Sequence, residues 1–464
     1  MLAGTDSYAA FSVAYHAAAA RQRTPANVTI EISHRCPLNC QHCYNNLPVG
    51  DEAARRAELS TEEQIRILDE MADAGSLWLL FTGGEIFARR DFLDVYTHAK
   101  RRGFIITLFT NGTLVSPRIA DHLVSYRPFS IEITLYGRTK ETYEALTRVP
   151  GSYEACLRGI RLLKERNLPL TVKTVAVTVN RHEIWEMRRY VEEELGLPFR
   201  FDAMMSPRID CSQSPLATRL SPEEIVELDL RDPRRVDDWQ TRSSVLVAPP
   251  RGGTADEVYH CGGGVHSFSV DPTGQMAICG FSRRDEYSLR NGTVAEGWGT
   301  FLKGVRQRKA TRVTKCTACH LRSACGMCPA NGELENGDPE EPVDFLCHVA
   351  HLRAETLGWK VPAHGDCEYC PGGERRALLE EETAALRRRL EDSPVPAFEP
   401  PPQLLPALPL LAARCGAVDG GAVAEHGVLP LPSLPAPRPV RFEAPGTVGN
   451  PPRGPEADLD GRPG

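Results

Sequence analysis

The chain has 464 residues, of which 41% are hydrophobic and 25% are charged, a composition typical of a globular protein of about two to four domains. Its 54 Lys and Arg residues against 61 Asp and Glu residues give a net charge of −7, which disfavours nucleic-acid binding because such proteins usually carry a basic excess. No apolar run approaches a membrane span and the N-terminus lacks a signal-peptide pattern, so the 15 cysteines predict metal ligands in a reducing cytoplasm.

The first half of the chain alternates between strands and helices. Residues 1–26 are an Ala-rich N-terminal segment in which 14–21 is either a helix or a loosely docked terminus. Six strands rich in β-branched and aromatic residues are predicted at 28–32, 77–82, 104–110, 130–136, 170–178 and 199–204. Helices are predicted at 60–74, 89–102, 117–126, 152–166, 182–195 and 222–230. Such alternation predicts parallel βα units, and six are too few for an eight-fold barrel. We therefore expect an α/β domain over 27–230, either an open six-stranded barrel or a doubly wound sheet.

The second half is organised differently. Residues 231–258 carry charge, Pro and Gly and are predicted to be a linker. Residues 259–360 hold seven cysteines with little periodicity, and so small a core needs metal to fold. Residues 361–392 combine a Cys-x2-Cys pair with a charged helix over 374–391. Residues 393–464 contain 17 prolines, which predicts a disordered Pro-rich tail.

Three cysteines follow the first predicted strand. Cys36, Cys40 and Cys43 form C-x3-C-x2-C, at the end of a strand where βα folds place their chemistry. A 4Fe–4S cluster takes one thiolate at each iron, so three cysteines leave one iron open for another ligand. A structural zinc site with His34 or His42 as fourth ligand is the alternative.

This loop, with aromatic His42 before its last cysteine, resembles that of the radical S-adenosylmethionine (SAM) superfamily. Residues 82–85, TGGE, are similar to that family's GGE motif, and 110–113, TNGT, resemble a further segment but are equally a plain turn. The resemblance implies that the SAM amino group is held by Gly83, Gly84 and Glu85. It also implies that Thr134 meets the SAM ribose and that Arg148 meets the SAM carboxylate. For Arg148 a plain surface arginine is the alternative.

The resemblance also implies the activity and the fold. In this family a reduced 4Fe–4S cluster cleaves SAM to a 5′-deoxyadenosyl radical, which removes a hydrogen atom from the substrate. A reductant such as flavodoxin or ferredoxin supplies the electron. The fold implied is a partial (β/α)6 radical SAM barrel, followed by a small cysteine-rich domain and the tail.

That cysteine-rich domain resembles the SPASM extension of radical SAM peptide-modifying enzymes, which holds up to two auxiliary 4Fe–4S clusters. The resemblance implies one cluster on Cys316, Cys319, Cys325 and Cys347 and another on Cys261, Cys279 and Cys328, whose fourth ligand is unassigned. The spacing before Cys328 is two residues instead of the usual three. A pair of zinc knuckles is the alternative, although zinc ribbons usually separate their Cys-x2-Cys pairs by about 15–20 residues.

Other polar residues have two interpretations. Cys367 and Cys370, with His364 and Asp366, supply either an extra ligand or a zinc site, or are a pair of inert or redox-active thiols, which is the interpretation that we favour slightly. Asp202 and Lys173 either face the barrel mouth or are satisfied structural groups; for Asp202 the structural interpretation is favoured. Cys156 is predicted to be a small buried hydrophobic residue.

The best-fitting function is a radical SAM/SPASM maturase of ribosomal peptides (RiPPs) in the cytoplasm, which modifies a peptide or protein side chain. Gly280 stands where sulfatase maturases carry an acidic residue, which disfavours that subgroup. Only 27 residues precede the first strand, so we expect any leader-peptide-binding domain to be a separate protein. A radical SAM enzyme of haem or other cofactor biosynthesis is one alternative, and a non-catalytic iron–sulfur or zinc protein is another.

Overall fold

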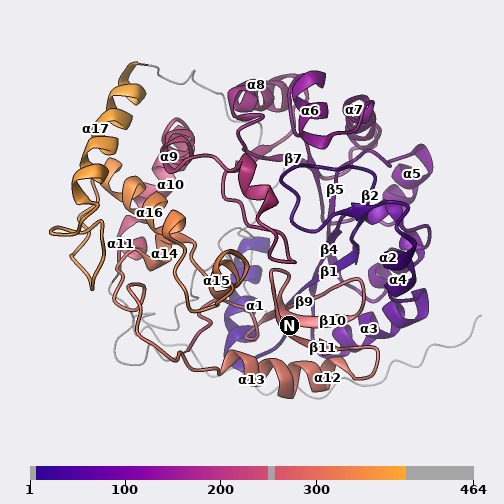
Figure 1. Ribbon diagram of the computed structural model, residues 1–464. Helices are drawn as coiled ribbons and strands as arrows, with labels where there is room; N and C mark the ends of the chain where they lie inside the picture. The colour runs from indigo at the N-terminus through magenta and orange to yellow at the C-terminus, as the bar shows by residue number, and fades with distance from the viewer. Residues whose placement is uncertain (1–6, 249–256, 393–464) are drawn as a thin grey trace, which may run out of the picture. The chain divides into compact units, whose positions relative to one another are not determined.

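The computed structural model describes residues 7–248 and 257–392. Within them the main element is a nine-stranded sheet in the order β11-β10-β9-β1-β4-β5-β6-β7-β8. Six neighbouring parallel strands correspond to the six predicted ones: β1 (Asn27–Ser33), β4 (Trp78–Gly83), β5 (Ile105–Thr110), β6 (Ser130–Thr134), β7 (Leu170–Val175) and β8 (Phe199–Asp202). The predicted α/β fold with a partial (β/α)6 barrel is therefore confirmed (Figure 1).

Helices connect the parallel strands and lie along the outer side of the sheet (Figure 1). They are α3 (Thr61–Asp73), α4 (Phe92–Arg101), α5 (Pro117–Ser125), α6 (Lys140–Thr147), α7 (Ser152–Lys164) and α8 (Ile184–Arg189). The predicted capping box opens α3, since Ser60 Oγ accepts from the Glu63 N–H and Glu63 accepts from the Ser60 N–H. Helix α6 was not predicted, because its eight residues make barely two turns and show little periodicity.

The sheet does not end with the barrel. Strands β9 (Ser267–Val270), β10 (Gln275–Cys279) and β11 (Ser282–Ser288) extend it beyond β1, and β9 runs parallel to β1 with Asn27 opposite Ser267. The other two pairings, β9 with β10 and β10 with β11, are antiparallel. The sequence analysis predicted no strands in this region. These strands are short, and β9 pairs with the buried strand β1, a partner that the sequence of this region alone does not reveal.

The predicted N-terminal helix is present as α1 (Tyr8–Gln22) and is docked. Tyr15 packs edge-on against Trp78, with ring centroids 5.2 Å apart, and the Trp78 indole N–H donates to the Tyr8 hydroxyl over 2.9 Å. The aromatic contacts bury the start of β4, so the loosely docked alternative does not hold.

The remaining elements follow the barrel or lie in its loops. The segment expected to be a linker is helical in part, over α10 (Pro233–Thr241) and α11 (Ser243–Leu246). Helices α9 (Pro222–Leu230), α16 (Asp344–Thr356) and α17 (Arg376–Asp392) pack together (Figure 1), and the buried pair Asp229–Arg353, at 2.6 Å, joins α9 to α16. The shorter elements are β2 (Arg35–Cys36), β3 (Leu47–Pro48), α2 (Glu52–Ala57), α12 (Val294–Glu296), α13 (Leu302–Arg306), α14 (Arg322–Cys325) and α15 (Pro329–Asn336).

No helix in the described part of the chain is both long enough and apolar enough to cross a membrane. The predicted disordered tail, residues 393–464, lies outside the described residues.

Candidate active site and metal centres

The first cysteine loop, residues 36–43, leaves the carboxyl end of β1 and is held by backbone hydrogen bonds. Cys36 belongs to β2, which pairs with β3. Farther along, the N–H groups of Asn39 and Gln41 donate to the last two carbonyls of α6 over 3.0 and 3.1 Å. Carbonyls at a helix C-terminus lack partners within the helix, so the loop satisfies α6 while α6 fixes the loop.

The three thiols of this loop lie close together in a buried setting. Burial raises the pKa of Cys36 to about 12 and is also the main cause of the raised pKa of Cys43. Burial raises the pKa of Cys40 as well, and the neighbouring thiols of Cys43 and Cys36 raise it further. Such thiols stay protonated at neutral pH unless a metal replaces the protons. This donor set fits an iron–sulfur cluster or another thiophilic metal centre.

The two glycines of the GGE segment hold the end of β4 against the start of the cysteine loop. Gly83 has a φ of +130°, and a Cβ on it would lie 2.2 Å from the Ser33 carbonyl oxygen. A Cβ on Gly84 would lie 2.4 Å from the His34 carbonyl oxygen, and the Gly84 N–H donates to Ser33 over 2.7 Å. Only glycine permits so close an approach of two backbones.

The Glu85 carboxylate is buried and joins the ends of β4 and β5. It accepts hydrogen bonds from Thr110 Oγ1 at 2.7 Å, from the Asn111 N–H at 2.8 Å and from the Phe87 N–H at 3.2 Å. Burial raises the pKa of Glu85. With these protein donors in place, Glu85 fixes the geometry of the segment around the cysteine loop.

Asn111 contacts the first cysteine loop. The sequence analysis left open whether its segment, 110–113, is a family motif or a plain turn. The side-chain amide of Asn111 donates to Cys36 Sγ over 3.4 Å, while its Oδ1 accepts from the Thr113 N–H at 2.9 Å. The available signal was its position directly after β5, since neighbouring parallel strands bring their carboxyl ends to one edge.

The other two residues predicted to bind SAM lie at the same end of the barrel. Thr134 is the last residue of β6 and is half-buried, opposite Lys173 of β7. Arg148 is exposed and directly follows α6, the helix that holds the cysteine loop, with a φ of 56°. The structure therefore brings the cysteine loop, the GGE segment, Thr134 and Arg148 to one edge of the sheet.

Tyr136 is a site residue that the sequence analysis missed. It follows β6 by two residues, its side chain contacts Cys40, and its ring lies edge-on to His42 with centroids 4.9 Å apart. Burial lowers the pKa of His42 to about 4, which keeps this imidazole neutral at physiological pH. The signal that could have found it was an aromatic residue at the carboxyl end of the strand predicted over 130–136.

Charged side chains lie across β6, β7 and β8 on one face of the sheet. The buried Glu132 pairs with Lys173 Nζ at 3.0 Å and with Arg200, and Lys173 Nζ lies 2.9 Å from the centroid of the Phe109 ring. Lys173 is thus a partner of Glu132. Asp202 accepts from the Met204 N–H at 2.9 Å, which is a local backbone role.

The predicted trio Cys261, Cys279 and Cys328 is brought together from three separate segments of the chain. Cys279 ends β10, and Cys328 directly precedes α15. Burial raises the pKa of Cys279 to about 12, with the adjacent thiols of Cys328 and Cys261 adding to the rise. As in the first loop, buried neighbouring thiols fit a metal centre.

The predicted quartet also gathers in one place. Burial raises the pKa of Cys325 to about 12, and the nearby Cys316 and Cys319 thiols raise it further. Cys347 joins them from α16. The pKa of Cys347 is raised by a contact with Cys367, by burial and by the nearby Cys325 thiol, in decreasing order. The structure therefore places the cysteines of each expected group near one another, and Cys347 also contacts Cys367.

Next to the quartet lies a group that the sequence analysis identified only in part. Cys367, Cys370 and His364 are buried together, and the fourth member is His351 of α16. Asp366, considered as a ligand from the sequence, is exposed. Cys156 is buried within α7, as predicted, and Cys211 is exposed.

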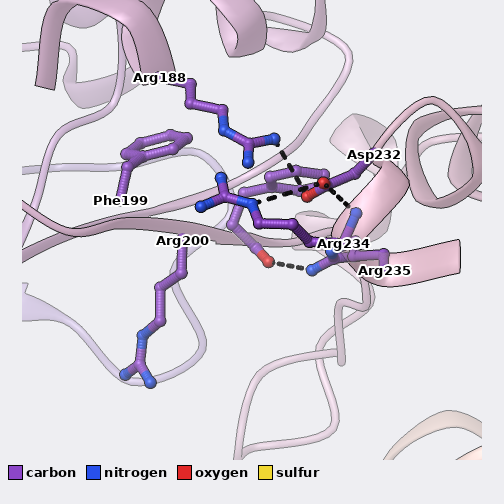
Figure 2. A pocket seen from close by; sticks show the side chains of 7 residues that line it. Arg188, Phe199, Arg200, Asp232, Arg234 and Arg235 are labelled. Atoms are coloured by element: carbon purple, nitrogen blue, oxygen red, sulfur yellow. Dashed lines mark hydrogen bonds and ion pairs between the residues drawn. The ribbon is translucent and has the colours of Figure 1, made fainter. Parts of the chain in front are cut away.

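A small pocket of about 150 Å³ lies apart from the cysteines, lined by Arg188, Phe199, Arg200, Phe201, Asp232, Arg234 and Arg235 (Figure 2). Arg188 pairs with Asp232 at 3.1 Å, and Arg234 pairs with Glu192 at 2.9 Å. Pairing of the lining charges is typical of a structural ion-pair network.

A parallel βα barrel with a buried three-cysteine loop at the carboxyl edge of its sheet defines a class of iron–sulfur enzymes. The family model described as the radical SAM superfamily matches residues 30–191, which span β1 to α8. Residues 30–191 therefore form a radical SAM domain. The cofactors are accordingly a 4Fe–4S cluster and SAM, for which the buried thiols of the first loop provide a fitting donor set.

Relatives include two kinds of enzyme. The chain is 31% identical over 168 residues to a PqqA peptide cyclase of Granulibacter bethesdensis, covering 36% of this chain and 43% of that protein. It is 24% identical over 349 residues to an AdoMet-dependent heme synthase of Methanosarcina barkeri, covering 70% and 97%. The structure matches Streptococcus suis SuiB with a TM-score of 0.55 at 17% identity, over 75% of this chain and 84% of that one, which shows a shared fold.

Proposed function

We propose that this radical SAM enzyme is a maturase that modifies a side chain of a peptide or protein. The observation that carries the proposal is the pair of auxiliary cysteine groups, set in a fold shared with SuiB over most of both chains. SuiB has been solved bound to the precursor peptide SuiA, and the PqqA peptide cyclases are relatives at up to 31% identity. The proposed class of product is a RiPP-type modified peptide.

In this proposal Cys36, Cys40 and Cys43 hold the 4Fe–4S cluster, which when bound supplies the electron that cleaves SAM. Gly83 and Gly84 bring the β4 backbone to the loop, where it can bind the SAM amino group, and Glu85 holds that turn in place. Their shared edge of the sheet supports this arrangement.

The remaining assignments rest on position. Thr134 and Arg148, at the same edge, are proposed to meet the SAM ribose and carboxylate. Tyr136 and His42 form an aromatic wall beside Cys40. A wall of this kind excludes water from the reacting groups, which protects a radical from side reactions.

The two auxiliary groups are proposed to hold one 4Fe–4S cluster each, on Cys316, Cys319, Cys325 and Cys347 and on Cys261, Cys279 and Cys328. Both groups contain thiols whose pKa burial raises, which supports metal binding in each. The second group offers three cysteines, so its fourth iron is open to another ligand. A reducing compartment such as the cytoplasm, with a flavodoxin or ferredoxin as reductant, suits these free thiols. A separate leader-peptide-binding protein is a further proposed partner.

Haem biosynthesis is the second candidate, and coverage favours it: alignment with the heme synthase of M. barkeri spans 97% of that enzyme. Sequence identity favours the peptide cyclases, at 31% against 24% for the heme synthase, but over 168 residues instead of 349. The two candidates differ in substrate while sharing the cluster and SAM.

An assay of anaerobically reconstituted full-length protein with SAM and dithionite distinguishes the two candidate functions. We expect a mass change in a precursor peptide encoded beside the gene, together with 5′-deoxyadenosine, and no change in an iron porphyrin precursor of haem. Conversion of the porphyrin with the peptide unchanged would reverse the choice. The variant with Cys36, Cys40 and Cys43 all changed to Ala should form no 5′-deoxyadenosine, whereas Cys211→Ala should retain wild-type formation.

A further inference from the structure

A tight group of four metal-ligating side chains shares no member with either proposed auxiliary centre but lies against the quartet, where Cys367 contacts Cys347 and His364 contacts Cys319. The ligand atoms of His351, His364, Cys367 and Cys370 all lie within 4.8 Å of one another, and each residue is at most 6% exposed. Among the residues that the structure describes, this is the one set of three or more such ligand atoms that gathers so closely. Two thiols and two imidazoles make a common donor set for tetrahedral zinc.

The compactness of the group favours a single ion over a cluster. A mononuclear tetrahedral ion draws four ligand atoms around one centre, whereas a 4Fe–4S cluster takes each thiolate at a different iron, so its ligands stand farther apart. Cys367 Sγ lies 3.2 Å from His351 Nε2, and Cys370 Sγ lies 3.9 Å from His364 Nε2. These separations suit ligands of one ion.

Both histidines are oriented by hydrogen bonds from the ring nitrogen that a metal does not need. His351 Nδ1 lies 2.8 Å from the Cys347 carbonyl oxygen, and His364 Nδ1 lies 2.9 Å from the Pro362 carbonyl oxygen. A carbonyl only accepts, so each Nδ1 carries the proton and donates, which leaves Nε2 with a free lone pair. This is the usual second contact of a metal-bound histidine.

The backbone around the cysteine pair is shaped for close ligands. The Cys370 N–H donates to the Cys367 carbonyl over 3.3 Å, and the Gly373 N–H donates to the Cys370 carbonyl over 2.8 Å. A Cβ on Gly373 would lie 2.5 Å from the Cys367 carbonyl oxygen, so the tight turn after the pair needs glycine. Tyr369, between the two cysteines, is buried with its ring stacked on His351 at 5.1 Å.

We propose that His351, His364, Cys367 and Cys370 bind one structural zinc ion, which ties the segment after α16 to the helix that carries Cys347. Four protein ligands close the coordination shell, so the site has no open position for a substrate. Cys347 and His351 are one helical turn apart, and Cys347 touches the site at two points: its Sγ lies 3.6 Å from His351 Nδ1, and its thiol contacts that of Cys367. The zinc therefore fixes the helix from which Cys347 reaches the auxiliary quartet.

Metal analysis of full-length protein, expressed with added zinc and purified anaerobically, tests this. We expect about one zinc per chain besides iron, and a zinc X-ray absorption spectrum with two sulfurs at about 2.3 Å and two nitrogens at about 2.0–2.1 Å. Cys370→Ser and His364→Asn should each lower zinc to less than about a fifth of the wild-type content and leave at least the four irons of the first loop.

Controls separate this site from its neighbours. Cys211→Ser, an exposed thiol outside every group, should keep both metals. Cys347→Ser should lower iron while zinc stays bound. Absence of zinc from the wild type, a shell of sulfurs alone, or a Cys367–Cys370 disulfide by mass spectrometry overturns the proposal, as does loss of iron instead of zinc in Cys370→Ser. If the variants fail to fold, the wild-type spectrum decides. None of these readouts depends on the substrate of the enzyme.

Discussion

The guanidinium of Arg283, on β11 of the cysteine-rich region, donates to the carboxylate of Glu31, on the first strand of the barrel. The side chains are 13% and 2% exposed, so the pair is buried where the two regions share one sheet. Glu31 also accepts from Asn45 at 2.8 Å and Tyr44 at 3.1 Å, two residues directly after the first cysteine loop. The ion pair therefore connects that loop with the strands that lead to Cys279.

Arg283→Ala is expected to destabilise the protein by about 3 kcal/mol, because it removes the guanidinium that faces the buried Glu31 carboxylate. Glu31 then keeps its contacts with Tyr44, Asn45 and His34. Thermal unfolding under anaerobic conditions measures the loss. Arg284→Ala, the neighbouring residue on the same strand, serves as the matched control and should change stability little. Equal stability of the two variants would show that the Glu31–Arg283 pair does not stabilise the contact between the barrel and the cysteine-rich region.

Gly84→Ala should disrupt the cysteine loop, because the new Cβ would meet the His34 carbonyl oxygen at 2.4 Å. Overpacking against backbone costs about 1–3 kcal/mol or more, and the loop has to move to relieve it. Iron content after reconstitution should fall by about four per chain. Gly50→Ala, which meets nothing within 4 Å, is the control and should keep its iron. Full iron in the Gly84 variant would contradict the described contact.

Asn111→Ala removes the amide that donates to Cys36 Sγ. Hydrogen bonds to cluster sulfurs stabilise the reduced state, so the potential of the cluster in the first loop should fall. We expect unchanged iron, a more negative midpoint potential by spectroelectrochemistry and slower SAM cleavage. Asn336→Ala removes an amide that donates to the Pro342 carbonyl, and it should alter none of these three properties. An unshifted potential in the Asn111 variant would rule out this role.

Replacing Cys316 and Cys319 with Ala should remove about four of about twelve irons, since each 4Fe–4S cluster contributes four. Some SAM cleavage should persist, because the first loop lies on the barrel and keeps its three thiols. Product formation should fall further than cleavage. Quantifying iron, 5′-deoxyadenosine and product in one preparation tests all three. A double variant with full iron and full turnover would refute the assignment of this quartet.

Asp91 supplies a pH-dependent contribution to stability near the cysteine loop. Burial alone would raise its pKa, but hydrogen bonds from Arg89 and Thr61 lower the pKa to about 2. A carboxyl with a lowered folded pKa stabilises the protein above its unfolded pKa, about 3.9, and loses that effect as the pH falls toward 2. Asp91→Asn should therefore melt lower than wild type by a constant margin between pH 5 and 8, values chosen about one unit or more above that pKa.

The same melting series at lower pH provides the check. The margin between wild type and Asp91→Asn should narrow below about pH 4, because the Asp91 carboxyl of the unfolded wild-type chain takes up a proton there while that of the folded chain does not. A margin that widens on acidification would mean that Asp91 is not stabilised by its pairing with Arg89. Because Asp91 is only partly buried, solvent reduces the size of the effect.

The sequence by itself determined the features that depend on neighbours along the chain. The spacing of Cys36, Cys40 and Cys43, the GGE segment and the six parallel strands were all predicted, because local propensity and short spacings are written in consecutive residues. The capping box of Ser60 and Glu63 belongs to the same category.

Only the tertiary structure decided which distant residues meet. Strands β9–β11 form because β1 offers a free edge, and the register of that pairing places Arg283 beside Glu31 from 252 positions away. His351 joins Cys367 and Cys370 because α16 packs beside the segment after it, whereas the sequence suggested Asp366 as a ligand. Such contacts come from packing and register between elements, which no local pattern of residue types encodes.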